Sequence, residues 1–573
     1  MPFWASLTDG PWAKRNRFRF SVAAAFALAV LLGAPADFAT TASQAASSTK
    51  HLETPATRLA TLSAASPASP AVQRLQSRIS AILNAPDLAH GFWGIEVISL
   101  ATGEALYAQN ADKLFTPASN TKLFTTAAAL ALIGPEYKFH TTVETTGTLD
   151  RYGRLNGDLV LVGHGDPNLS GRALPYDVRT QRADDPLQAL ESLADSLVQK
   201  GVKFVDGDVV GDDSYFAFER YGEGWSQDDL VWADGAPVSA LTVNDNVVFV
   251  KIQPADRAGE KAFVTINPFA DYYRIDNRIV TTPAGTGRKF FVNREPGSTV
   301  VTLWGNLPLD DPGASEALAI EEPATFAAGI FRQLLEKRGV VIYGHESTRH
   351  TELASISTFT ATAIAPSHGG SEDVSRPLGR PIKSDQPVVL ASYESKPLVD
   401  DVKVINKVSQ NLHAEILLRL LGRERGNAGT VEGGLEVLRE FLTQAGVASD
   451  QYVFYDGSGL SRQNLVTPQA IVQLLHYAMS QPWGAAYKAS FPVAGVDGSL
   501  AERLTAPRLA KRVMAKTGSL SGVRALSGYA TTESGQPVVF SIMSNNLNLP
   551  AKRVTDTIDG LVEAIVEDSA ATK

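Results

Sequence analysis

A serine and a lysine three residues apart, Ser119 and Lys122, stand in the segment FTPASNTKLF, just before a run of alanine and leucine. On a helix, positions i and i+3 share a face, so the lysine amine can reach the serine hydroxyl. An unprotonated lysine would accept the hydroxyl proton and make the serine a nucleophile. The pattern alone is weak evidence, because a second Ser-x-x-Lys begins at Ser47 in a low-complexity stretch. By itself the segment predicts only a helix start, with Thr116 as N-cap and Pro117 at the first helical position.

Two downstream motifs add side chains that suit acyl transfer. Ser409 and Asn411 frame a serine-x-asparagine motif before a helical run, and Lys516–Gly518 reads Lys-Thr-Gly after an apolar stretch. Lysine on an edge strand with a following threonine can bind a carboxylate, and glycine lets a substrate backbone approach closely. Each motif also has an ordinary interpretation. A second serine-x-asparagine begins at Ser544, and a surface strand can simply end in Lys-Thr-Gly.

The composition limits the remaining chemistry. The chain has 573 residues, 44% of them hydrophobic and 20% charged, and a formal net charge of −9, which predicts a globular protein of three or four domains. No long basic tract follows the N-terminus, which argues against a nucleic-acid partner. There is no cysteine, so disulfides, thiolate metal sites and a thiol nucleophile are excluded. No His-Glu-x-x-His set, P-loop or dinucleotide fingerprint occurs, and we expect no metal and no cofactor.

The N-terminus resembles an export signal. Four basic residues between Lys14 and Arg19 precede an apolar run from Val22 to Gly33, which is short for a membrane span, and small residues follow. We predict a signal peptide over 1–36, with cleavage as late as about residue 45, and a periplasmic or otherwise extracytoplasmic protein. An uncleaved anchor is the alternative.

The rest of the chain divides into a low-complexity leader, a β-rich middle and flanks with helical patterns. Residues 37–70 are rich in Ala, Ser, Thr and Pro and predict a flexible leader. Short β-rich runs with Gly and Asp turns fill the middle, while helical patterns and a few strands occupy both flanks. The economical interpretation is one α/β domain, formed by 71–140 and 388–573, interrupted by inserted β-rich domains over 141–387. The expected elements are a helix from about Val72, a hairpin of 92–99 and 104–108, helices near 187–199 and 324–337, two strands near the C-terminal end, and an amphipathic helix over 551–567.

S-x-x-K, S-x-N and K-T-G in this order are the active-site elements of penicillin-binding proteins and serine β-lactamases. The chain resembles the class C, type 4 penicillin-binding proteins, the D-Ala-D-Ala carboxypeptidase/endopeptidase serine peptidases, from about residue 94 to residue 546. The hallmark of that family is a large insertion between the first two motifs, and here the separation is 409 − 119 = 290 residues. The other segments that carry the resemblance are GDLVLVGHGDPNL, GDDSYF, GAPVSAL, LASYESKPL, INKVSQNLHAEILL, YDGSGLSRQNLVTP, FPVAGVDGSL and AKTGSLSGVRALSGY.

This resemblance implies a fold and a reaction. The fold is an α/β (α+β) penicillin-binding, transpeptidase-like domain, with an antiparallel sheet flanked by helices and interrupted by a large β-rich insertion of one or two domains. Ser119 attacks the carbonyl of the penultimate D-Ala and forms an acyl-enzyme, and Lys122 is the base, helped to lose its proton by burial and by Lys516. Ser409 relays a proton toward the leaving amine, and Asn411 orients the substrate amide or Lys122.

The third motif is implied to bind the substrate. Lys516 supplies positive potential and Thr517 a hydroxyl to the terminal carboxylate, and Gly518 lets the substrate approach. The oxyanion hole is implied to use the backbone N–H groups of Ser119 and Ser519.

A specificity pocket follows from the same resemblance. Asp212 and Arg462 match positions where the family binds the side chain of the third residue of the peptide stem. A carboxylate suits a free amine such as that of diaminopimelate, and an arginine suits its carboxylate. Leu520 and Ser521 are implied to line this pocket. An acidic turn and an arginine at a helix start are the ordinary interpretations of Asp212 and Arg462.

The resemblance thus implies a serine-type D-Ala-D-Ala carboxypeptidase, with DD-endopeptidase action also open. Peptidoglycan peptides and β-lactams would be its partners, with at most weak membrane association. The alternatives are a β-lactamase, a biosynthetic transpeptidase or a non-catalytic cell-wall binding protein. No E-x-x-L-N element is evident to support a β-lactamase. Gln410 stands where the family often has Asp, and we expect its side chain to point away from the nucleophile. His413 is expected only to pack on its helix.

Overall fold

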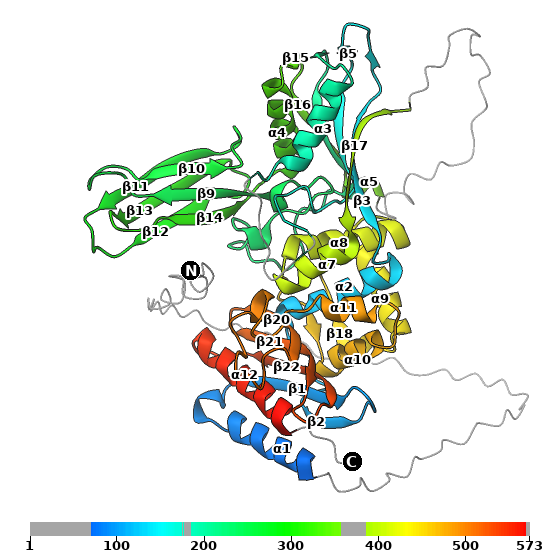
Figure 1. Ribbon diagram of the computed structural model, residues 1–573, viewed down its shortest axis with the longest axis vertical. Helices are drawn as coiled ribbons and strands as arrows, with labels where there is room; N and C mark the ends of the chain where they lie inside the picture. Colours follow the sequence, from blue (N-terminus) through cyan, green and yellow to red (C-terminus); the bar gives the residue numbers. More distant parts are fainter. Residues whose placement is uncertain (1–69, 175, 177–184, 357–385, 569–573) are drawn as a thin grey trace, which may run out of the picture. The chain divides into compact units, whose positions relative to one another are not determined.

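The computed structural model describes residues 70–174, 176, 185–356 and 386–568 (Figure 1). The expected signal peptide and all of the expected leader except Pro70 lie outside these residues. Helix α1 (Pro70–Leu83) opens the described chain, as the apolar spacing from Val72 predicts. Among the helices of these residues, none combines the length and hydropathy that a membrane span needs.

A five-stranded antiparallel sheet joins the two ends of the described chain, in the order β2-β1-β22-β21-β20. Strand β1 from the N-terminal part pairs along its whole length with β22 from the C-terminal part, and β20 forms the outer edge. The expected hairpin of β1 and β2 is confirmed, as are two antiparallel strands near the C-terminal end. The bounds are β1 Phe92–Ser99, β2 Ala105–Gln109, β20 Val513–Leu520, β21 Val523–Thr531 and β22 Pro537–Asn545.

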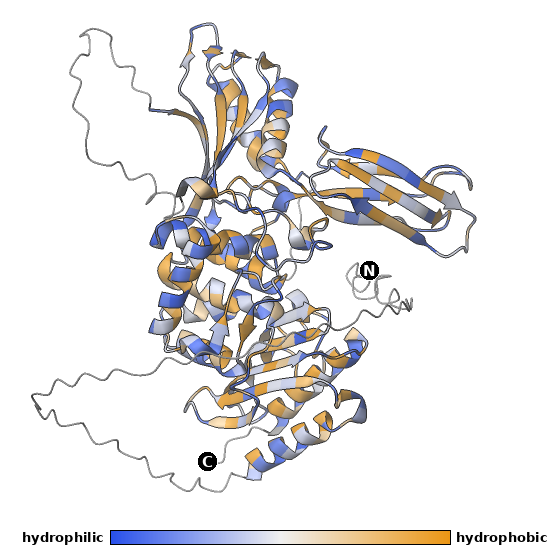
Figure 2. Ribbon diagram, turned by 180° about the vertical axis from the view of Figure 1, so that it is seen from behind, coloured by the Kyte–Doolittle hydropathy of each residue, from blue (hydrophilic) through white to orange (hydrophobic). Residues whose placement is uncertain are grey.

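Helices cover both faces of this sheet. On one face α1 and α12 (Ala551–Asp568) pack against each other and the sheet. Both helices carry polar and apolar residues (Figure 2), and apolar residues of each are buried in this layer, as in amphipathic helices. On the other face α10 contacts β1, β21 and β22. The hydrophobic core on this side of the sheet also contains the buried helix α8. The elements of this second layer are α2 Thr121–Leu132, α7 Leu398–Lys407, α8 Asn411–Arg425, α9 Val431–Gln444, β18 Tyr452–Val453, β19 Leu465–Val466, α10 Pro468–Ala478 and α11 Gly484–Ala489.

The described residues between α2 and α7 form four further sheets. A mixed sheet has the order β16-β8-β6-β3-β17 and is covered by α3 and α4, and a smaller sheet has the order β15-β7-β5-β4. The elements are β3 Lys138–Thr145, β4 Thr148–Leu149, β5 Arg154–Asn156, β6 Leu159–Gly163, α3 Gln188–Gln199, β7 Phe204–Val205, β8 Val209–Ala217, α4 Pro323–Lys337, β15 Val341–Ile342, β16 Glu346–Thr351, α5 Leu353–Ile356 and β17 Val388–Pro397.

The other two sheets are three-stranded, with orders β10-β9-β14 and β11-β13-β12. Their inward residues share one hydrophobic core with the mixed sheet and with α3 and α4. Their strands are β9 Val247–Gln253, β10 Phe263–Asn267, β11 Arg274–Thr282, β12 Lys289–Arg294, β13 Val300–Pro308 and β14 Ala314–Ala319.

The predicted fold class is therefore confirmed: an antiparallel sheet flanked by helices carries a large β-rich insertion between α2 and α7. The expected helices near 187–199, 324–337 and 551–567 are also present. The domain boundaries at 140/141 and 387/388 stay predictions. Strands β3 and β17, which lie at these two boundaries, pair with each other.

Candidate active site

Ser119 lies in a single 3-10 turn, Ala118–Asn120, directly before α2. The expected helix start at Pro117 is therefore wrong, because α2 begins only at Thr121. Ala118 adopts a left-handed φ of 49°, a conformation that costs a residue with a side chain on the order of 1–3 kcal/mol. Two glycines allow the turn to pack this closely. A Cβ on Gly459 would lie 1.9 Å from the Ala118 carbonyl oxygen, and one on Gly518 would lie 2.7 Å from that of Pro117.

Lys122 is fully buried in the first turn of α2 and reaches the serine as its spacing predicts. Its Nζ donates to Ser119 Oγ at 3.0 Å, to Asn411 Oδ1 at 2.6 Å and to the Ser458 carbonyl oxygen at 2.6 Å. Burial lowers the pKa of Lys122 to about 8, against the opposing effect of nearby carboxylates, first among them Asp456. An amine with a pKa this near neutrality can exchange a proton with the Ser119 hydroxyl.

The second motif sits at the start of α8. Ser409 has a left-handed φ of 63°, and Asn411 is the first residue of the helix. Gln410 caps the helix, because its side-chain oxygen accepts a hydrogen bond from the Leu412 N–H at 3.1 Å. Asn411 connects helix α2 with the insertion. Its oxygen accepts from Lys122 on α2, and its amide nitrogen donates to the carbonyl oxygen of Asp234 in the insertion at 2.9 Å.

The third motif lies on β20, at the edge of the five-stranded sheet, as predicted. Lys516 is fully buried, and its Nζ donates to Ser409 Oγ at 2.9 Å and to the Thr517 carbonyl oxygen at 2.9 Å. Burial, together with the positive charge of Lys122, lowers the pKa of Lys516 well below its ordinary value. The Thr517 hydroxyl is 2.7 Å from that of Ser499.

These motifs open onto one cavity of about 430 Å³. Two serine–lysine pairs therefore converge on a space that could hold a peptide end, with the lysines behind the serines. The lining residues are Ser119, Ser226, Asp228, Asp229, Asp234, Val408, Ser409, Asn411, Gly459, Leu460, Arg462, Thr517, Ser519, Leu520 and Ser521.

The predicted specificity residues separate into two groups. Arg462 lies at the cavity with Leu520 and Ser521, and its guanidinium donates to the Ser521 carbonyl oxygen at 3.1 Å. Asp212 does not line the cavity. Its carboxylate is 2.9 Å from the guanidinium of Arg349 and accepts from Ser214.

The acidic side chains at the cavity are instead Asp228, Asp229 and Asp234. Burial, together with the charges of Asp228 and Asp234, raises the pKa of Asp229 to about 6, against the opposing effect of Arg462. The cavity therefore combines an arginine with several carboxylates.

Sequence reasoning missed the groups that support Lys122. Glu415 on α8 is fully buried, and its Oε1 accepts from the N–H groups of Gly457 and Ser458 at 2.9 and 2.8 Å. These contacts fix the turn whose Ser458 carbonyl oxygen faces Lys122. The Asp- and Gly-rich segment YDGSGL signals such a turn, but its partner on another helix leaves no local signal.

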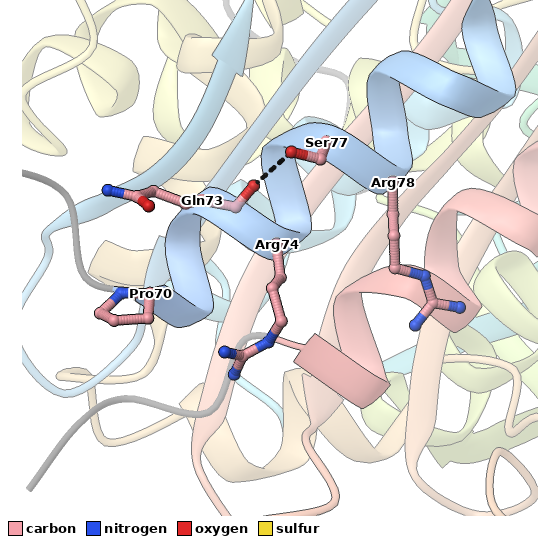
Figure 3. Close-up of a pocket in the computed structure, with 5 residues that line it drawn as sticks. All are labelled: Pro70, Gln73, Arg74, Ser77 and Arg78. Carbon is pink, nitrogen blue, oxygen red and sulfur yellow. Dashed lines mark hydrogen bonds between the residues drawn. The ribbon is translucent and has the colours of Figure 1, made fainter.

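A second hollow, of about 550 Å³, lies beside α1 and is lined by one helix face, with Arg74 and Arg78 pointing the same way (Figure 3). It contains no nucleophile paired with a base, so we assign the chemistry to the smaller cavity. Within the described residues, no group of histidine, aspartate and glutamate side chains is arranged to hold a metal ion.

Comparisons with known proteins agree with this geometry. The family model for the D-Ala-D-Ala carboxypeptidase 3 (S13) family matches residues 75–359 and 368–565. The D-alanyl-D-alanine carboxypeptidase of Actinomadura sp. (strain R39) is 36% identical over 488 residues, which are 83% of this chain and 82% of that protein. D-alanyl-D-alanine carboxypeptidase DacB of Haemophilus influenzae is 27% identical over 440 residues, which are 75% and 80% of the two chains.

A solved structure has the same fold. Penicillin binding protein 4 of Haemophilus influenzae matches with a TM-score of 0.70 at 24% identity, over 85% of this chain and 99% of that chain. Its complex with a β-lactam matches with a TM-score of 0.66 at 23% identity, over 86% and 99%.

Proposed function

Since this chain belongs to the D-Ala-D-Ala carboxypeptidase 3 (S13) family and is a serine-type D-Ala-D-Ala carboxypeptidase, we propose that Ser119 is its nucleophile and peptidoglycan stem peptides are its substrates. The observation that carries this assignment is the contact of Lys122 Nζ with Ser119 Oγ, Asn411 Oδ1 and the Ser458 carbonyl oxygen, beside the cavity. The hydrogen bonds to Asn411 and Ser458, together with complete burial, keep the amine of Lys122 next to the Ser119 hydroxyl.

Acylation would begin with neutral Lys122. The lysine takes the proton of the Ser119 hydroxyl as the oxygen attacks the carbonyl of the penultimate D-Ala. The backbone N–H groups of Ser119 and Ser519 stabilise the oxyanion. The peptide C–N bond then breaks as the Ser409 hydroxyl relays to the leaving amine the proton that Lys122 took, which returns Lys122 to its neutral form. Lys516 lies within hydrogen-bond distance of Ser409 and orients it. Water then hydrolyses the acyl-enzyme and releases the shortened stem.

The third motif would bind the terminal carboxylate. Lys516 and Thr517 lie on the edge strand β20. A bridge between Val493 and Met514 occupies the start of its outer side, and beyond it no strand of the described residues pairs with β20, so an extended peptide can lie along the part from Lys516 onward. A negative carboxylate beside Lys516 favours the charged ammonium. Both a terminal D-Ala and a D-Ala–diaminopimelate cross-link present a carboxylate on a D-centre, so we include DD-endopeptidase action in the proposal.

The third residue of the stem would meet the wall formed by Arg462, Leu520 and Ser521. A carboxylate on that residue suits Arg462, and a free amine suits Asp228 and Asp229 rather than Asp212, which is bound to Arg349. Diaminopimelate carries both groups and is the substrate we favour.

Two further parts of the proposal concern inhibition and location. We infer that β-lactams acylate Ser119, supported by the β-lactam complex of penicillin binding protein 4 from Haemophilus influenzae. We also infer an extracytoplasmic location, because peptidoglycan lies outside the cell membrane and the N-terminal sequence resembles a signal peptide.

The experiment compares wild type with Ser119→Ala, using a fluorescent penicillin and a pentapeptide muropeptide. Wild type should take the label and release D-Ala, whereas Ser119→Ala should do neither, with activity lower by about 10⁴-fold or more. Ser47→Ala, which removes the other Ser-x-x-Lys serine, is the matched control and should behave as wild type. Labelling of Ser119→Ala would contradict the assignment. Cleavage of cross-linked dimers only would make the activity endopeptidase.

A further inference from the structure

A buried histidine lies beside the second motif. His413 is on α8, two residues after Asn411, and has no exposed surface. Its Nδ1 is 2.6 Å from Asp401 Oδ1, and its Nε2 is 3.2 Å from Asp245 Oδ1. Both ring nitrogens face carboxylate oxygens, an arrangement that suits an imidazolium, which donates from both nitrogens. Burial alone would lower the pKa of His413, but Asp401 and Asp245 raise it above its ordinary value.

Asp245 links this histidine to the second motif. It lies in the insertion, in a buried turn where Asn244, Asp245 and Asn246 have left-handed φ angles of 52°, 57° and 52°. While Oδ1 faces His413, Oδ2 accepts from Arg172 Nε at 2.9 Å and from Gln410 Nε2 at 3.2 Å. The expectation that His413 only packs on its helix is therefore too weak.

Gln410 is held at both ends of its amide. Its oxygen accepts from the Leu412 N–H, and its nitrogen donates to Asp245. The preceding residue, Ser409, is in the left-handed region, where a residue with a side chain stays only when its surroundings hold it. Clamping Gln410 therefore fixes the backbone that aims Ser409 Oγ at Lys516.

We propose that His413 and Asp245 are positioning residues for acylation, which hold Gln410 and thereby keep the Ser409 hydroxyl within reach of Lys516. The insertion then supplies part of the catalytic geometry through Asp245, as it does through the Asp234 carbonyl that binds Asn411. This inference rests on the proposed role of Ser409.

A double-mutant cycle tests it with His413→Gln, Gln410→Ala and the double variant. The readouts are the first-order acylation constant and the noncovalent Kd for a fluorescent penicillin, obtained from stopped-flow traces. We expect each single variant to lower the acylation constant about tenfold while Kd changes less than twofold, and the double variant to lose no more than either one. Single effects below twofold, or effects that multiply to about 100-fold, would overturn the proposal.

A matched control separates positioning from general stability. His350 Nδ1 is also 2.6 Å from an aspartate oxygen, that of Asp213, and its other neighbours, Glu322 and Phe218, are not part of the second motif. His350→Gln should leave the acylation constant within twofold of wild type, and a tenfold loss there would overturn the proposal. If His413→Gln does not fold, Gln410→Ala alone decides, with a tenfold loss expected and a loss below twofold contradicting it.

Ser409→Ala distinguishes this inference from its premise. If Ser409→Ala acylates as fast as wild type, the proposed role of Ser409 fails and the positioning network fails with it. If Ser409→Ala is slow but Gln410→Ala is not, only the positioning inference is wrong.

Discussion

Two serine–lysine pairs meet at one cavity, and they differ in what surrounds the lysine. The Nζ–Oγ distance is 3.0 Å for Lys122 and Ser119 and 2.9 Å for Lys516 and Ser409, and both lysines are fully buried. Lys122 also lies near the carboxylates of Asp456, Glu415 and Asp234, which support its positive charge against burial. The charge that acts most on Lys516 is the like charge of Lys122.

This difference separates two roles that similar geometry would leave equal. The protein supplies the countercharges that place the Lys122 pKa at about 8, so this amine is adjusted for proton transfer. Lys516 has no such support, and the negative group that would stabilise its ammonium is the substrate carboxylate. Among the described residues, carboxylates act on Lys122 but not on Lys516. We therefore assign proton transfer to Lys122 and carboxylate binding to Lys516.

The largest expected effect follows from replacing the base. Lys122→Ala should lower the acylation rate by about 10²–10⁴-fold, the usual contribution of a general base. Stopped-flow labelling with a fluorescent penicillin measures this loss. A loss smaller than that of Lys516→Ala would reverse the roles assigned to the two lysines.

Replacing the second lysine should act mainly on carboxylate recognition. Lys516→Ala should lower kcat/KM for a pentapeptide by about 10–100-fold, the range of a lost charge-assisted hydrogen bond. An otherwise identical peptide with an amidated C-terminus should lose little. The exposed lysine five residues earlier gives the control Lys511→Ala, which should cleave both peptides as wild type does. Equal losses on both peptides would argue against carboxylate binding.

The dependence of kcat/KM on pH tests whether nearby carboxylates raise the pKa of Lys122. The neutral amine is the active base, so kcat/KM should rise about tenfold per pH unit below the pKa and level off above about pH 8. Glu415→Gln removes a negative charge that raises this pKa, so the inflection should move to lower pH, by about one unit at most. Because burial raises the pKa of Glu415 itself to about 7, the gain in activity should appear between about pH 7 and pH 8 and be small at pH 6. A shift toward higher pH would contradict the assigned electrostatics.

Arg462 lines the cavity and is exposed, whereas Lys122 and Lys516 are buried. Its replacement should therefore have the smallest effect on catalysis. Arg462→Ala should raise KM for a diaminopimelate stem by up to about fivefold, because exposed charge pairs contribute about 1 kcal/mol or less. A stem whose third residue lacks the carboxylate is the comparison substrate. Asp212→Asn should leave both KM values within twofold, and a larger change would return Asp212 to the specificity pocket.

Local patterns were enough to predict much of the fold. Strand-like runs on either side of a turn predicted β1 and β2. Helical spacing predicted α3, α4 and α12, because one buried face sets the helical period. The start of α2 was predicted wrongly. The left-handed Ala118 depends on the close approach of Gly459 and Gly518, which are more than 300 residues away in the sequence, and local preference for a helix start cannot report such contacts.

In the candidate site, too, some residues were predicted from the sequence and others were missed. The three motifs and their family resemblance identified Ser119, Lys122, Ser409 and Lys516 and the pairing of Ser119 with Lys122. Glu415, the Ser458 carbonyl, the Asp401–His413–Asp245 group and the contact of Ser409 with Lys516 were missed. Each of these acts through a partner on another element or through a backbone atom, whose position no side-chain pattern records. The role of Asp212 in specificity stays a prediction, since a matching position in sequence does not specify which way a carboxylate points, and here the carboxylate contacts Arg349.

The pairing of β1 with β22 has a consequence for how the protein is made. The ribosome completes β1 at Ser99 and reaches β22 at Pro537, which is 537 − 99 = 438 residues later. At ordinary synthesis rates of about 5–20 residues per second, this interval is roughly 20–90 s. The insertion can form its own core during that time, while the first motif waits without its sheet. A chain that ends just before residue 537 would therefore carry Ser119, Lys122 and the whole insertion, yet lack the strand that joins β1 to β21.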